Sequence, residues 1–210
     1  MTIDAVIWDF GGVILSSPFE AFNIFEAERG LPRDFVRGVN SVNPDTNAWA
    51  RYERNEIDLN GFDQAFLEES TRLGHAVRGA EIVALLEGEL RPAMVEALQR
   101  CKARFKVACI TNNVATESRR PPEAKAAVAA VMDIFHLVIE SSKVGLRKPD
   151  PRIYQLACEQ LGVDPARSVY LDDLGINLKP ARALGMQTIK VIDPTVALAE
   201  LEAIVGFPLG

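Results

Sequence analysis

Carboxylates stand at two points where the chain changes from apolar to polar residues. Asp9 follows an apolar run at residues 5–8. Asp172 and Asp173 follow a second apolar run at residues 168–171. An aspartate at the end of a strand can attack a phosphoryl group or a carbon centre as a nucleophile. Two adjacent carboxylates repel each other in a partly dry crevice, and a bound Mg²⁺ ion would remove that repulsion.

Lys148 and the pair Thr111-Asn112 could complete such a site. Lys148 precedes a proline-rich turn, and the prolines predict a helix that begins near Asp150. Its ammonium would offset the repulsion between an anionic nucleophile and an anionic substrate. A lysine before a turn is usually solvated, and Thr and Asn are common in loops, so these residues indicate chemistry only in combination with the carboxylates.

Signatures of other catalytic sites do not occur in the chain. The sequence contains no G-x-G-x-x-G, G-x-x-x-x-G-K-[ST], G-x-S-x-G or H-E-x-x-H motif. His75 and His136 have no Cys or Asp partner at metal-ligand spacing, so we expect both to be structural. Cys101, Cys109 and Cys158 form no Cys-x-x-Cys motif, and we expect buried, reduced thiols.

Strands and helices alternate in the segments that must position these residues. We expect strands at residues 5–8, 106–110, 137–139, 168–171 and 188–191, with helices at 92–104 and 150–161. This alternation predicts a doubly wound parallel sheet with right-handed crossovers. Ligands of such sheets bind beyond the carboxyl ends of the strands, so the residues that end them should converge. They are Asp9, Thr111, Glu140 or Ser141, and Asp172-Asp173.

Residues 17–89 interrupt this alternation with a helical pattern and no convincing strand. We therefore expect a core domain made of residues 1–16 and 90–210, with residues 17–89 as an inserted helical domain. Flexible joins are predicted near residues 15–18 and 90–92.

The composition is that of an ordinary globular protein. The 210 residues are 48% hydrophobic and carry a net charge of −6. This charge gives no basic surface for nucleic acid. No apolar run approaches the roughly 18 residues that span a membrane, and Asp4 and Asp9 interrupt any signal-peptide pattern. We expect a cytoplasmic protein without nucleic-acid or membrane partners; composition does not decide its oligomeric state.

Four segments in order resemble the motifs of the haloacid dehalogenase (HAD) superfamily. They are D-F-G-G-V at residues 9–13, I-T-N-N at 110–113, G-L-R-K-P-D-P at 145–151 and Y-L-D-D-L-G-I-N at 170–177. Residues 138–193 look especially like the N-terminal phosphatase domain of soluble epoxide hydrolases. The resemblance implies a Rossmann-like α/β core, and it implies that residues 17–89 form a helical cap over the active site.

The resemblance also assigns roles within a Mg²⁺-dependent phosphatase of a small phosphorylated metabolite. Asp9 would form an aspartyl-phosphate, Thr111 would bind the transferring group, and Asn112 would shape the pocket. Asp173 would bind Mg²⁺ directly, and Asp172 would support it directly or through water. Lys148 would lie beside the nucleophile and the phosphoryl oxygens. Asn177 would either orient the carboxylates or cap a helix.

Gly11 departs from the pattern of the family's phosphatases. They usually carry a second aspartate at this position, which protonates the leaving group. A glycine offers the metal its backbone carbonyl but supplies no proton, and the loss of a positioned acid typically costs about 10²–10⁴-fold in rate. We expect a phosphatase restricted to good leaving groups, or one whose proton donor comes from the inserted helices.

Two alternatives remain open. A metal-independent 2-haloacid dehalogenase would need no proton for the departing halide, but it would leave Asp172-Asp173 unexplained, and the segment after Asp9 lacks the Tyr-Gly-Thr of such enzymes. A non-catalytic binding or regulatory domain could retain the scaffold, although the complete set of motif residues argues against it.

In the insertion, candidates for facing the substrate are Arg51, Tyr52, Arg54 and Asn55, although such residues on a helix are more often simply solvated. Trp49 is expected to anchor the packing.

Overall fold

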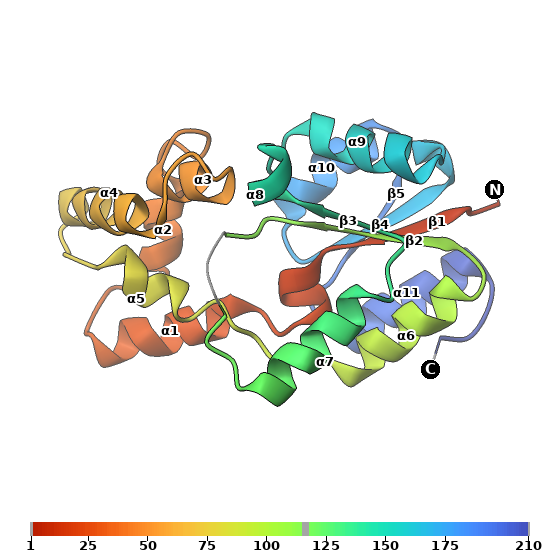
Figure 1. Ribbon diagram of the computed structural model, residues 1–210, viewed down its shortest axis with the longest axis horizontal. Coiled ribbons are helices and arrows are strands. Elements are labelled where there is room, and N and C mark those ends of the chain that lie inside the picture. Colours follow the sequence, from red (N-terminus) through yellow and green to blue (C-terminus); the bar gives the residue numbers. More distant parts are fainter. Residues whose placement is uncertain (1, 115–117, 210) are drawn as a thin grey trace.

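The computed structural model describes residues 2–114 and 118–209. Within them, five parallel strands form one sheet in the order β3-β2-β1-β4-β5 (Figure 1). The strands are β1 (Ala5–Trp8), β2 (Lys106–Thr111), β3 (Leu137–Glu140), β4 (Ser168–Asp172) and β5 (Gln187–Lys190). The predicted parallel α/β sheet is confirmed, and each strand agrees with its prediction to within one residue at either end.

Helices cover both faces of the sheet (Figure 1). One face packs against α6 (Pro92–Lys102), α7 (Pro122–Met132) and α11 (Pro194–Val205), and the other against α9 (Pro151–Leu161) and α10 (Gly175–Ala183). The short elements are α8 (Ser141–Val144) and a 3-10 turn at Pro165–Arg167. Proline begins α6, α7, α9 and α11, where its missing N–H has no helical partner to lose.

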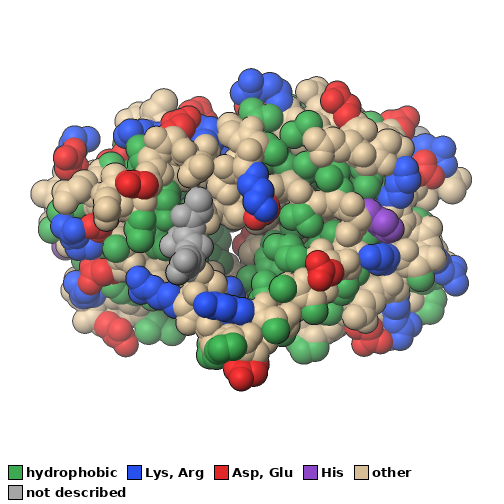
Figure 2. Space-filling view, viewed as in Figure 1, with side chains coloured by type: hydrophobic (Ala, Val, Ile, Leu, Met, Phe, Trp, Pro, Cys, Tyr) green, Lys and Arg blue, Asp and Glu red, His purple; other side chains and the backbone are tan. Residues whose placement is uncertain are grey.

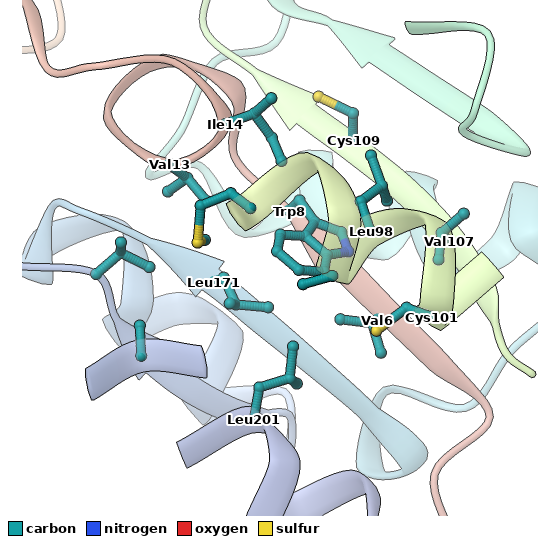
Figure 3. Close-up of a cluster of buried hydrophobic side chains, with 14 of the residues drawn as sticks. Val6, Trp8, Val13, Ile14, Leu98, Cys101, Val107, Cys109, Leu171 and Leu201 are labelled. Carbon is teal, nitrogen blue, oxygen red and sulfur yellow. The ribbon is translucent and has the colours of Figure 1, made fainter. Parts of the chain in front are cut away.

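The central strand β1 is buried on both faces of the sheet. Trp8 points into one hydrophobic cluster, together with Leu98 of α6 and Leu171 of β4 (Figure 3). Ile7 alternates to the opposite face and packs in a second cluster with residues of α9 and α10. A strand enclosed in this way is a rigid support for the residue that follows it, which is Asp9.

Residues 17–89 fold as five helices beside the carboxyl ends of the strands (Figure 1). They are α1 (Pro18–Glu28), α2 (Phe35–Ser41), α3 (Ala48–Glu53), α4 (Leu59–Arg72) and α5 (Gly79–Val83). As expected, this segment, all of which the structure describes, contains no strand. Its helices enclose a separate hydrophobic cluster built on Phe22, Phe62 and Phe66.

Two connecting segments join these helices to the sheet, and they run antiparallel to each other. Leu15 forms a β-bridge with Leu90, and the Ser16 N–H donates to the Glu89 carbonyl at 2.7 Å. A side chain at Gly88 would place its Cβ 2.5 Å from the Ser16 carbonyl oxygen, so this close approach requires glycine.

The histidines and cysteines have structural surroundings. His136 Nδ1 accepts a bond from the Val107 N–H at 3.0 Å, and His75 packs edge-on against Phe35. Cys101, Cys109 and Cys158 are buried and free. Among the described residues, no helix has the length and apolar character needed to cross a membrane.

Candidate active site

Asp9 begins a tight turn where β1 ends. Its backbone N–H donates to the Leu171 carbonyl at 2.8 Å, which continues the pairing of β1 with β4. Its side chain accepts from the Phe10 N–H at 2.7 Å and caps the turn Phe10–Ile14. Within that turn Gly12 has φ of +80°, and a Cβ there would lie 2.2 Å from Asp173 Oδ2. The turn therefore needs glycine both for its backbone conformation and for its approach to Asp173.

Lys148 joins the ends of β1 and β4. Its side chain is 1% exposed, and Nζ lies 2.7 Å from Asp9 Oδ1 and 2.8 Å from Asp172 Oδ2. Burial alone would lower the pKa of the ammonium, but the charges of Asp172 and Asp9 outweigh it and raise the pKa above its usual value. The lysine therefore stays charged between the two carboxylates.

Asn112 fixes the backbone of Lys148. Its Oδ1 accepts from the Lys148 N–H at 2.8 Å, and its Nδ2 donates to the Lys148 carbonyl at 3.0 Å. Thr111, the last residue of β2, is buried beside Asn112. The structure thus brings Asn112 and Lys148 together, 36 residues apart in the chain.

Asp172 is fully buried and accepts several hydrogen bonds. Besides Lys148, the Tyr170 hydroxyl donates to Oδ2 at 2.5 Å, and the Leu174 N–H donates to Oδ1 at 2.8 Å. Asn177 Nδ2 lies 3.0 Å from Oδ1 and 3.1 Å from Oδ2. Of the two roles open to Asn177, the observed contacts are those that orient a carboxylate. Both oxygens of Asp172 are therefore engaged by protein donors.

Asp173 lies differently from its neighbour. Its side chain accepts a long contact of 3.5 Å from Ser17 Oγ. Burial, followed by the charge of Asp172, raises the pKa of Asp173 to about 6, although Lys148 acts in the opposite direction. Unlike Asp172, this carboxylate keeps oxygen capacity for a ligand.

Asp9, Asp172 and Asp173 form one acidic group, in which one oxygen of each lies within 4.8 Å of the others. Burial raises the pKa of Asp9 well above its usual range; Lys148 opposes this effect, while Asp172 and Asp173 add to it. The crowding of these carboxylates and the raised pKa values of Asp9 and Asp173 suit a hard divalent cation, which binds oxygen ligands and favours their ionised form. The donor set fits Mg²⁺, with open capacity on Asp173 and on Oδ2 of Asp9.

Gly11 lies open beside this group. Its φ of −71° and ψ of 129° are accessible to any residue, and a Cβ at this position would meet no heavy atom within 4 Å. The Cβ of an aspartate, the residue that the family pattern has at this position, would therefore fit here without a clash.

Of the predicted substrate-facing residues, Tyr52 was assigned wrongly. Its ring is 1% exposed and stacks on Phe62 with centroids 4.6 Å apart, because the apolar ring completes the hydrophobic cluster of the insertion. Arg51 and Asn55 are exposed, and Arg54 pairs with Glu56. Trp49 packs edge-on against Phe62, as expected for an anchor.

The sequence pattern did not predict that Glu53 and Arg147 lie near the candidate site. Glu53, at the end of α3, is buried and accepts from Arg147 Nε at 2.6 Å and from Asn112 Nδ2 at 3.2 Å. It joins the helical insertion to the loop that carries Lys148. Figure 2 shows a hollow between the insertion and the rest of the molecule. Glu53 and Arg147 are 94 positions apart in the chain, so no local pattern predicts the pair.

Several curated proteins are similar to this chain. Mouse acyl-CoA dehydrogenase family member 10 is 36% identical over 98% of the chain, and pig bifunctional epoxide hydrolase 2 is 32% identical over 100%. The chain spans only 19% and 40% of these two proteins. Phosphatase MT3486 of Mycobacterium tuberculosis is 30% identical, with 89% of the chain and 86% of that protein covered.

Solved structures share the fold. A HAD family enzyme of Bacteroides thetaiotaomicron, crystallised with magnesium and inorganic phosphate, superposes with a TM-score of 0.60 at 20% identity, covering 90% of this chain and 93% of the other.

The family model for haloacid dehalogenase-like hydrolases matches residues 3–185. That span includes the four sequence motifs and the acidic group at the ends of β1 and β4. The chain therefore belongs to the haloacid dehalogenase-like hydrolases.

Proposed function

We propose that this hydrolase is a Mg²⁺-dependent phosphatase of a small phosphorylated metabolite, acting through an aspartyl-phosphate at Asp9. The observation that carries the proposal is the buried Lys148 ammonium, which lies 2.7 Å from Asp9, a member of one acidic group with Asp173. A positive charge fixed beside a carboxylate nucleophile suits an anionic phosphoryl group. Relatives with phosphatase in their names, such as MT3486, support the same reaction class.

Asp9, Asp173 and the backbone carbonyl of Gly11 would hold the ion. Asp172 would support it indirectly, because its oxygens already accept bonds from Lys148, Tyr170 and Asn177. When bound, Mg²⁺ would neutralise charge on the phosphoryl oxygens and between the carboxylates.

The protein residues would carry out a two-step displacement. Asp9 would attack phosphorus through a carboxylate oxygen, and the bond to the leaving-group oxygen would break with its electron pair staying on that oxygen. Lys148 and Thr111 would bind the phosphoryl oxygens. Water would then attack the aspartyl-phosphate, releasing inorganic phosphate and restoring the Asp9 carboxylate. Since Gly11 carries no acid, leaving groups that depart as stable anions would react fastest.

The five helices of residues 17–89 would form a cap domain over a core of residues 1–16 and 90–210. Closure would exclude water and bring cap side chains to the substrate. The free, buried cysteines suit a reducing compartment, and we place the protein in the cytoplasm.

A second candidate, 2-haloacid dehalogenation, is favoured by Gly11 alone. A halide needs no proton as it leaves, so the glycine would cause no loss. This reaction gives no role to Asp173, and for that reason we rank it below phosphate transfer.

Hydrolysis assays on acetyl phosphate, glucose 1-phosphate and an aryl phosphate test the proposal. Each substrate is measured with and without Mg²⁺, with the wild-type protein and with Asp9→Asn. We expect turnover that requires both Mg²⁺ and Asp9, fastest on acetyl phosphate. Absence of turnover on all three would remove the proposal, and 2-haloacids would then be assayed without metal.

A further inference from the structure

Glu53 contacts Asn112, which holds the backbone of Lys148, and Arg147, which precedes Lys148 in the chain. Asn112 holds the Lys148 peptide groups on both sides, and its Nδ2 also donates to Glu53 Oε2. Arg147 precedes Lys148 in the chain and donates to the same oxygen at 2.6 Å. A single carboxylate from the insertion therefore contacts the side chain that clamps Lys148 and the residue that leads into it.

This carboxylate is itself held firmly. Glu53 is 6% exposed, and its other oxygen accepts from Trp49 Nε1 at 2.8 Å. Arg147 is held from a second side, because its Nη1 donates to the Pro44 carbonyl of the insertion at 3.0 Å. A buried carboxylate that lost Arg147 and Asn112 would be left without its compensating partners, which disfavours any displacement of α3 from this loop.

We infer that Glu53 is a positioning residue for the proposed phosphoryl transfer: seated on Asn112 and Arg147, it sets the place of Lys148 and links the reactivity of Asp9 to the seating of the insertion. The inference rests on the proposed function only for its kinetic consequence. Glu53 touches neither Asp9 nor Lys148 Nζ and acts through Asn112.

The matched variants are Glu53→Gln and Glu56→Gln. Glutamine keeps the size of Glu53 but has only one oxygen. Its amide NH₂ group would therefore face either the Trp49 N–H or the N–H donors of Arg147 and Asn112, and that contact would be lost. Glu56 lies three residues further on and pairs with Arg54 at an exposed site, so its substitution controls for loss of a nearby charge.

The kinetic test uses acetyl phosphate and the full chain. Small misplacements of a catalytic group can cost up to about 10²-fold, and we expect Glu53→Gln to lower kcat by roughly 10-fold while KM changes little. Glu56→Gln should match the wild type. In an Asn112→Ala background the Glu53 substitution should have almost no further effect, because the residue through which it acts is gone. An equal loss of kcat in both backgrounds would contradict positioning through Asn112.

Amide hydrogen exchange at Lys148, measured by NMR, tests the same inference without turnover. Its N–H donates to Asn112, so exchange should be faster in Glu53→Gln and unchanged in Glu56→Gln. Unchanged exchange in Glu53→Gln would overturn the inference, whatever the kinetics show. If the wild type hydrolyses no phosphate ester, the proposed function fails, and the exchange measurement alone decides whether Glu53 positions Lys148.

Discussion

Asp172 and Asp173 are adjacent in sequence and equal in charge, yet their side chains have different surroundings in the fold. Asp172 is engaged by Lys148, Tyr170 and Asn177, whereas Asp173 faces the turn at Gly12. The sequence could predict that both lie in the site. The resemblance to the family separated their roles, but the residue pattern alone gave no reason for the difference, because Asp172 is occupied by side-chain contacts that include the distant Lys148.

Substituting the two aspartates separately should reveal this division. Asp173→Asn is expected to weaken Mg²⁺ binding markedly with little loss of unfolding free energy. Asp172→Asn should lower the unfolding free energy by roughly 3 kcal/mol, since removing one partner of a buried ion pair leaves Lys148 poorly compensated. Calorimetric titration with Mg²⁺ and urea unfolding measure the two effects. Unchanged Mg²⁺ affinity in Asp173→Asn would move the ligand role to another residue.

The raised pKa of Asp173 should make the metal-free protein sensitive to pH. The folded-state pKa is about 6, above the usual 3.8, so between these values the native state binds more protons than the unfolded state. The contribution of Asp173 to wild-type stability should therefore fall as pH rises through this window, by at most about 3 kcal/mol, because one pKa unit is worth about 1.4 kcal/mol.

Urea unfolding in EDTA from pH 4 to 7 measures this effect. The asparagine of Asp173→Asn does not titrate, so the stability of this variant relative to wild type should increase with pH. A constant difference between the two proteins across that range would contradict the assignment.

Gly11 and Gly12 are neighbours, but a side chain fits at Gly11 and not at Gly12. Gly11→Asp meets open space at Cβ, and we expect faster hydrolysis of substrates with poor leaving groups, by up to about 10²-fold, as the added acid protonates them. Gly12→Ala is the contrasting variant, because its Cβ would collide with Asp173 at a φ of +80°. It should lose Mg²⁺ binding. A slower Gly11→Asp enzyme would show that another group already supplies the proton or that the aspartate is badly placed.

At the scale of elements, most of the fold follows from local pattern. The apolar runs of β1 and β4 predict buried strands, and proline marks the starts of α6 and α9. The placement of α3 against the Lys148 loop was beyond prediction. It depends on the ion pair between Glu53 and Arg147 and on the hydrophobic cluster in which Tyr52 is buried. Tertiary packing determines both of these contacts.

Hydrogen exchange tests whether the insertion moves as a unit. The hydrophobic cluster of residues 17–89 is separate from the two clusters on the sheet, so we expect amides of α1–α5 to open more readily than those of β1 and β4. Equal protection of the insertion and the sheet, measured by mass spectrometry on the metal-free protein, would count against a mobile cap.

At the scale of the whole molecule, the residues of the candidate site come from segments far apart in the chain. Asp9, Lys148 and Asp172 meet because parallel strands bring their carboxyl ends to one edge of the sheet. That convergence was predictable from the alternation of strands and helices. The placement of the insertion at this edge was expected only from the family resemblance, because no local pattern specifies how two separate hydrophobic clusters meet.

The bridge between Leu15 and Leu90 has a consequence for the architecture of such proteins. The chain leaves the sheet and returns to it at adjacent points. For the folding of the sheet, the intervening 74 residues therefore act as one closed loop. Because the entropy of closing a loop grows only slowly with its length, insertions of very different size could be exchanged at this junction with little penalty to the sheet. Under the proposed function, substrate preference could then change with the inserted segment while the catalytic residues at the edge of the sheet stay the same.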